Sequence, residues 1–202
     1  MLRYVLAAAA VVSLAQVTFA ESLTTAPANN AQKSIFLDLT AKDANLQITG
    51  FDTAVEGATS IQVYIREGSY VGFDNSSAGW TLVDTITATN LTGSGYNMTG
   101  SFALTDGIFI DAGQTVGICL VSTTGYDIQY TDSYDVAQRT WENDDLILFG
   151  DRSRSAAFGG TYYWPRTFSG TIYYDIMPVP EPGSLALLGL GAVACLRRRR
   201  RA

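Results

Sequence analysis

The sequence of 202 residues contains no histidine and only two cysteines. Without histidine, a Ser-His-Asp or Cys-His catalytic arrangement and an imidazole-based zinc site are excluded. Cys119 lies in the apolar run TVGICLVS, where we expect a small buried core residue, and Cys195 lies in a second apolar stretch much later in the chain. We therefore expect no disulfide within the central part of the chain, which must be held together by packing.

The sequence also lacks a P-loop and a dinucleotide-binding fingerprint. The glycine-containing segment GSGYNMTG, residues 93–100, is followed by no lysine, and we interpret it as a hairpin loop. Residues 21–177 contain no sustained apolar repeat of 3.6 residues, and the segment 135–145 has room for one helical turn at most. These absences lead us to expect no catalytic residue and no cofactor.

Basic residues are scarce before the C-terminal tail. The whole sequence has 13 basic and 19 acidic residues, and residues 21–177 hold 7 of the former and 18 of the latter, so the net charge of this part is −11. Such an acidic surface repels phosphate backbones, and we expect no nucleic-acid partner.

Short apolar or alternating runs, separated by Gly, Asn, Asp, Ser and Thr, fill residues 21–177. Ile61, Val63 and Ile65 alternate with polar or amphipathic residues, which is the period of a half-buried strand. Nine such runs are expected to be strands: residues 34–41, 45–53, 60–67, 80–89, 100–105, 115–122, 126–132, 145–150 and 170–176. Asp106-Gly107 is expected to form a tight turn. The pattern predicts an all-β fold, an antiparallel jelly-roll-like β-sandwich of about nine strands.

Both ends of the sequence differ from this central part. Residues 1–20 have a basic start, an apolar middle and a small residue before Glu21, which is the pattern of a secretory signal peptide. Residues 178–202 begin with three prolines at alternate positions, which predict an extended tether. The 14 apolar residues 183–196 would span about 21 Å as a helix, against about 30 Å of hydrocarbon, so we expect one short transmembrane helix. Five basic residues follow, and their charge favours retention in the cytoplasm: Arg197, Arg198, Arg199, Arg200 and Arg201.

The tail VPEPGSLALLGLGAVACLRRRRRA, residues 179–202, resembles the PEP-CTERM protein-sorting domain. The same region is also labelled an ice-binding protein C-terminal domain, which we do not interpret as an activity because residues 21–177 have no regular Thr-x-Thr repeat. The resemblance implies an exosortase-type membrane transpeptidase as partner, cutting near Pro180, Glu181 and Pro182. It also implies a transient anchor in the inner membrane, display at the cell surface or in the extracellular matrix, and association with surface polysaccharide or biofilm. The central part resembles, more weakly, jelly-roll domains that precede such tails, which imply no single activity.

Two groups of side chains are candidates for ligand binding. Tyr162, Tyr163 and Trp164 lie in a segment flanked by glycine and proline, expected to be a loop, where their rings would either stack on sugars or close one end of the sandwich. Six carboxylates crowd residues 127–145, and they would form a solvated loop, a Ca²⁺ site or a glycosidase pair. The candidate Ca²⁺ ligands are Asp132, Asp135, Asp144 and Asp145.

Together these patterns predict an exported, non-enzymatic surface or matrix protein associated with extracellular polysaccharide. One alternative is a recognition module with a defined carbohydrate or Ca²⁺ ligand. Another is a glycan hydrolase that uses paired carboxylates.

Overall fold

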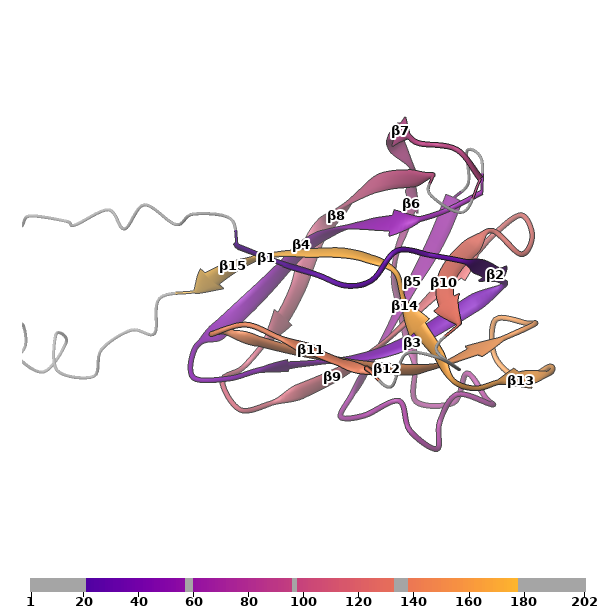
Figure 1. The fold of residues 1–202 in the computed structure, drawn as a ribbon. Coiled ribbons are helices and arrows are strands. Elements are labelled where there is room, and N and C mark those ends of the chain that lie inside the picture. Colours follow the sequence, from indigo (N-terminus) through magenta and orange to yellow (C-terminus); the bar gives the residue numbers. More distant parts are fainter. Residues whose placement is uncertain (1–20, 57–59, 96–97, 133–137, 178–202) are drawn as a thin grey trace, which may run out of the picture.

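A computed structural model describes residues 21–56, 60–95, 98–132 and 138–177. These residues form fifteen β-strands and no α-helix, and their strands pair antiparallel (Figure 1). One sheet has the strand order β1 (Glu21–Thr24), β15 (Gly170–Met177), β4 (Asn45–Ala54), β8 (Thr99–Ile110) and β7 (Thr89–Thr92). The prediction of an all-β sandwich is confirmed.

The opposing sheet has seven strands. Its order is β11 (Thr140–Glu142), β12 (Leu146–Arg154), β3 (Ser34–Ala41), β9 (Thr115–Ser122), β5 (Ser60–Glu67) and β6 (Thr81–Thr87), and β13 (Tyr162–Tyr163) also pairs with β12. A small third sheet comprises β14 (Arg166–Phe168), β10 (Ile128–Asp132) and β2 (Asn30–Gln32).

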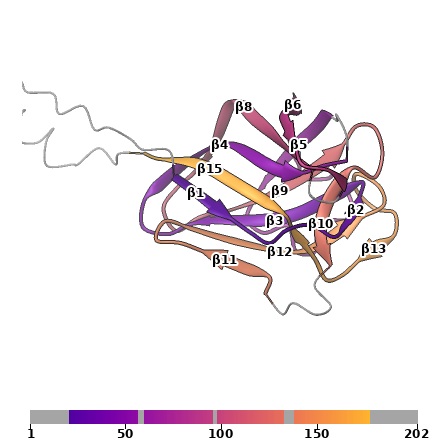
Figure 2. The same ribbon diagram turned by 45° about the horizontal axis from the view of Figure 1, so that its top comes forward.

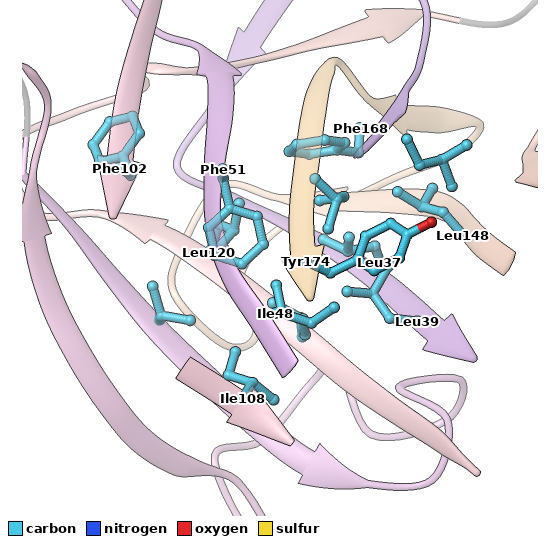
Figure 3. Packing of buried hydrophobic residues seen from close by; sticks show 14 of the residues in the cluster. Leu37, Leu39, Ile48, Phe51, Phe102, Ile108, Leu120, Leu148, Phe168 and Tyr174 are labelled. Carbon is cyan, nitrogen blue, oxygen red and sulfur yellow. The ribbon is translucent and has the colours of Figure 1, made fainter. Parts of the chain in front are cut away.

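The main core lies between the two large sheets (Figure 3). Phe51 of β4 and Tyr174 of β15 enter it from one side, and Leu37 of β3 and Leu120 of β9 enter from the other. All four side chains are buried, and burial of Leu37, Phe51 and Leu120 contributes about 1.5–3 kcal/mol of transfer free energy each.

A second, smaller core covers the outer face of the seven-stranded sheet. It explains why β3 and β9 are buried on both faces: Phe36 and Cys119 alternate with the main-core residues and point outward. The segments 68–80 and 155–160 fold over this face and bring Tyr70 and Phe158 onto Phe36, with ring centroids 6.0 Å apart in each pair. Cys119 is fully buried, as expected from its apolar run.

The strand count exceeds the expected nine because six short strands were not predicted: β1, β2, β7, β11, β13 and β14. Each has two to four residues, too few to show a period of two. Thr140–Glu142, inside the segment with room for a helical turn, is one of these strands and pairs with β12. The consecutive strands β7 and β8 pair antiparallel, in agreement with the expected hairpin, although the end of the expected loop, Thr99 and Gly100, belongs to β8 and residues 96–97 lie outside the described part.

The predicted turn at Asp106-Gly107 is wrong, because β8 runs through it. The register of β4 and β8 shifts there: Ile48 faces Ile108, whereas Gly50 faces Ala103, so β8 bulges. Gly107 has a φ of 71°, and a glycine serves such a bulge as well as it serves a turn.

The start of β1 and the end of β15 lie at the same end of the sandwich. Glu21 of β1 pairs with Tyr174 of β15, and Met177 of β15 pairs with Asn45 of β4. In both ribbon views the end of β15 is at the pole opposite β13 (Figures 1 and 2). The predicted signal peptide and C-terminal helix lie outside the described residues, and within those residues no helix is long and apolar enough to cross a membrane.

Candidate functional site

The candidate aromatic residues lie where β13 pairs with the end of β12. Tyr162 is directly opposite Arg154, and Tyr163 is opposite Ser153. The alternation of a strand sends consecutive side chains to opposite sides. Tyr162 therefore lies beside Arg152 and Arg154, with guanidinium carbons 5.1 and 5.5 Å from its ring centroid. Tyr163 instead lies 6.0 Å from the guanidinium carbon of Arg166.

A buried carboxylate holds the two arginines beside Tyr162. Asp74, in the segment that covers the outer face of the seven-stranded sheet, is 3 % exposed. Its Oδ1 accepts a hydrogen bond of 2.9 Å from Nη1 of Arg152, and its Oδ2 accepts one of 2.7 Å from Nε of Arg154. Burial opposes the charge of Arg152, but the Asp74 carboxylate outweighs this effect and raises the pKa of that guanidinium. The arginines are thereby fixed under the Tyr162 ring.

Trp164 is fixed by different contacts. Its indole Nε1 donates a hydrogen bond of 2.9 Å to Oδ2 of Asp151, and the guanidinium carbon of Arg139 lies 4.3 Å from its ring centroid. Asp151 is itself buried and accepts a 2.7 Å hydrogen bond from the hydroxyl of Tyr70. This hydroxyl stays protonated, because burial and the Asp151 carboxylate raise the pKa of Tyr70 far above its usual value.

The side chains of Tyr162 and Trp164 nevertheless remain 45 % and 42 % exposed. We call these two rings, with Arg139, Arg152 and Asp151, the aromatic platform. Its rings are oriented by the Nε1 hydrogen bond of Trp164 and by the guanidinium groups beside both rings, and their exposed parts can stack on an incoming ring. The guanidinium donors beside the rings can hydrogen-bond to hydroxyl groups, whereas the buried Asp151 serves to orient Trp164.

The structure divides the predicted aromatic triplet. Tyr162 and Trp164 belong to the platform, whereas Tyr163 is half-buried and faces the third sheet. The expectation of a loop is wrong in part, because Tyr162–Tyr163 and Arg166–Phe168 are strands. Asp74, Asp151 and Arg152 were not predicted. The only sequence signal for the latter two is the charged stretch DRSR at the end of β12.

The candidate carboxylates lie on separate elements. Asp132, on β10, forms an ion pair of 2.8 Å with Arg166 of β14. Asp144 and Asp145 follow β11, where Asp144 is exposed and Asp145 accepts a 3.3 Å hydrogen bond from the Tyr174 hydroxyl. Asp135 lies outside the described residues. Among the residues that are described, no group of three or more His, Cys, Asp or Glu side chains is arranged to hold a metal ion.

The comparison with protein families concerns the tail. Residues 178–201 match the PEP-CTERM protein-sorting motif, which confirms the resemblance of the tail sequence. No curated protein matches the chain. The matched residues contain Pro180, Glu181, Pro182 and the five arginines, all outside the described part. The motif implies exosortase-dependent export, with a transient membrane anchor before display at the cell surface. The chain thus carries a PEP-CTERM protein-sorting motif immediately after the last strand of a β-sandwich.

Proposed function

We propose that this protein is a non-enzymatic surface or matrix protein whose β-sandwich binds extracellular polysaccharide. The observation that carries the proposal is the aromatic platform. Two exposed rings, held in fixed orientations and bordered by charged hydrogen-bonding groups, suit the apolar faces and polar edges of sugar units.

The positions of Tyr162 and Trp164, two residues apart in the chain, support a polymeric ligand. Residues two apart along an extended strand are separated by about 6.6 Å, and Trp164 directly follows β13. Tyr162 and Trp164 can therefore contact neighbouring units of one chain. Because both rings are already ordered in the free protein, little side-chain entropy is lost when a ligand binds.

The location of the platform agrees with the sorting route. β13 lies at the pole opposite the end of β15, after which the sorting motif begins (Figure 1). A domain held by its tail at the membrane would present the platform away from its point of attachment.

A non-enzymatic role is supported by the arrangement of the carboxylates. A glycosidase pair needs two carboxyl groups facing one bond at about 5–10 Å from each other. Asp132 is engaged by Arg166, and Asp145 is engaged by Tyr174 on a different sheet. We expect no release of reducing ends from polysaccharides incubated with the protein, and sustained release would refute a purely binding role.

The binding role is tested by affinity electrophoresis of the full chain in gels that contain extracted extracellular polysaccharide. Trp164→Ala combined with Tyr162→Ala should weaken binding about tenfold, which corresponds to about 1.4 kcal/mol. Tyr126→Ala is the matched control, because Tyr126 is 57 % exposed and lies on the segment between β9 and β10. Equal retardation of the double variant and the wild type would overturn the proposal.

A further inference from the structure

A row of polar side chains crosses the outer face of the five-stranded sheet. Thr24 of β1 pairs with Thr171 of β15, which pairs with Asp52 of β4. Asp52 pairs with Ser101 of β8, and Ser101 pairs with Thr89 of β7. Each strand of the sheet thus contributes one residue, and we call these five residues the hydroxyl row.

Hydrogen bonds order the row from within. The hydroxyls of Thr24 and Thr171 lie 2.9 Å apart, and the Ser101 hydroxyl donates to Oδ1 of Asp52. Oδ2 of Asp52 accepts a 2.6 Å hydrogen bond from the hydroxyl of Tyr173, which lies two residues along β15. Each carboxylate oxygen has a second lone pair, and each hydroxyl keeps unused donor or acceptor capacity.

Tyr173 places an aromatic ring beside the row. It pairs with Gly50 of β4, which has no side chain to separate the ring from Asp52. A side chain at position 50 has no space, because its Cβ would lie 2.7 Å from the backbone oxygen of Phe102. The hydrogen bond to Asp52 raises the pKa of Tyr173, so the phenol remains a neutral donor over the physiological range.

One end of the row opens into a groove. A cavity of about 300 Å³ is bordered by Thr24, Asp52 and Thr171 of the row, and by Pro27, Thr99 and Ser169 among its other lining residues. This volume lies at the lower end of the range for small-ligand sites. None of the described residues that line the groove is cationic, and its only charged side chain is Asp52.

We propose that the groove and the hydroxyl row bind a linear, neutral polysaccharide, with Asp52 accepting hydrogen bonds from its ring hydroxyls and Tyr173 contacting a sugar face. Sugar hydroxyls both donate and accept, which matches the unused capacity of the row. An acidic polymer is disfavoured, because the only charge at the site is negative and residues 21–177 carry a net charge of −11.

The length of the row indicates a chain rather than a single sugar. Neighbouring strands lie about 4.8 Å apart, so the row from β1 to β7 extends about 19 Å. The site is separate from the aromatic platform, which lies on β12 and β13 of the other large sheet. A protein with both sites could hold two polysaccharide segments at once.

The experiment is affinity electrophoresis of the full chain in gels that contain dextran, laminarin or hydroxyethylcellulose, with alginate as the acidic comparison. At least one neutral glucan should retard the wild type, and alginate should retard it less. Asp52→Asn should weaken this binding about tenfold and Thr171→Val about threefold. Asp43→Asn and Thr87→Val, which alter exposed side chains elsewhere, should leave it unchanged. Thermal melting of each variant shows that it is folded.

Several outcomes would overturn this site. They are the absence of retardation by all three neutral glucans, unchanged binding in Asp52→Asn and Thr171→Val, and binding abolished by EDTA, which would indicate a bound cation. The Trp164 and Tyr162 variants separate the two proposals. Loss of neutral-glucan binding in those variants alone would assign this ligand to the aromatic platform.

Discussion

Glu21 and Tyr174 are directly paired residues of β1 and β15, so the first and last described strands lie side by side. β15 is also paired with β4 along its length and ends at Met177. The Pro180-Glu181-Pro182 triplet follows only three residues later. Cleavage at the triplet would therefore leave every strand of the sandwich intact.

Processing of the tail is the first prediction. Protein released to the cell surface should begin near Glu21 and lack the arginines, as measured by intact mass. Alanine at Pro180, Glu181 and Pro182 should leave the full-length protein in the membrane fraction, because the recognition motif is removed. Glu56→Ala, at an exposed position of the sandwich, should be processed normally. Recovery of the wild type only as uncleaved protein in the inner membrane would contradict this prediction.

The second prediction concerns the buried ion pairs of Asp74. Asp74→Ala leaves Arg152 and Arg154 without their shared carboxylate, and loss of one partner from a buried pair costs about 3–5 kcal/mol. We expect the free energy of unfolding in urea to fall by about this amount. Glu142→Ala is the control. Glu142 pairs with Lys42, but its side chain is 60 % exposed, so its removal should change the free energy of unfolding by less than about 1 kcal/mol. Equal effects of the two variants would show that Asp74 does not hold the platform together.

Sequence periodicity located the central strands well. The expected bounds 34–41, 60–67 and 115–122 coincide with β3, β5 and β9, because eight-residue apolar or alternating runs that are rich in β-branched and aromatic residues and bounded by turn residues are typical of strands. Periodicity did not predict the short strands, which form because of the strand they pair with. β14 has three residues and is defined by its pairing with β10, which no local pattern encodes.

The candidate site was predictable only in part, for the same reason. Glycine and proline around Tyr162 and Trp164 predicted a loop, whose rings would either stack on sugars or close one end of the sandwich, and the structure leaves both rings exposed. The carboxylate that fixes the arginines under Tyr162 comes from Asp74, which is 78 and 80 residues away from Arg152 and Arg154 in the sequence. The hydroxyl row likewise exists only through the register of five strands, so its members look like ordinary polar positions in the sequence.

The third prediction concerns Cys119. Its side chain is fully buried, so a reagent cannot reach it. Burial also raises the pKa of the thiol well above the usual value, so the reactive thiolate does not form. In a Cys195→Ser background, reaction with a disulfide reagent should be slower than in urea by a factor on the order of 100. The thiol of a Ser76→Cys variant, at an exposed position, should react rapidly without urea. Rapid reaction of Cys119 in the native protein would contradict its burial in the second core.

The fourth prediction is a pH dependence from Asp38. Its carboxyl group is buried beneath the 68–80 segment, where it accepts hydrogen bonds from the Ser69 hydroxyl and the Tyr70 amide. Burial raises its pKa above 3.8, despite these hydrogen bonds and nearby Arg66. A raised pKa means that the folded state favours the protonated form. The stabilisation is therefore complete below pH 3.8 and is lost as pH rises through the folded-state pKa.

Asp38→Asn, which cannot ionise, isolates this effect. The free energy of unfolding of the wild type minus that of the variant should be largest at the acid end and should decrease as pH rises. Urea titrations at several pH values above and below 3.8 measure the difference. Asp43→Asn, at an exposed position, should show no comparable trend. A difference that grows with pH would mean that the hydrogen bonds from Ser69 and Tyr70 outweigh burial.

The fifth prediction tests the close contact of β15 with β4. Gly170 begins β15 and pairs with Thr53, and a Cβ at this position would collide with the backbone oxygen of Asp52. Backbone atoms cannot move aside as the end of a flexible side chain can, so Gly170→Ala should separate the two strands locally. We expect the free energy of unfolding in urea to fall by more than about 2 kcal/mol, at the upper end of ordinary single substitutions.

Gly113→Ala is the comparison variant. Its Cβ would meet no atom within 4 Å, so its cost comes from its φ of 74° alone and should be smaller. Because Gly170 borders the groove, Gly170→Ala should also weaken neutral-glucan binding, whereas Gly113→Ala should not. A Gly170→Ala protein as stable as the wild type would contradict the close pairing of β15 and β4 on which the hydroxyl row depends.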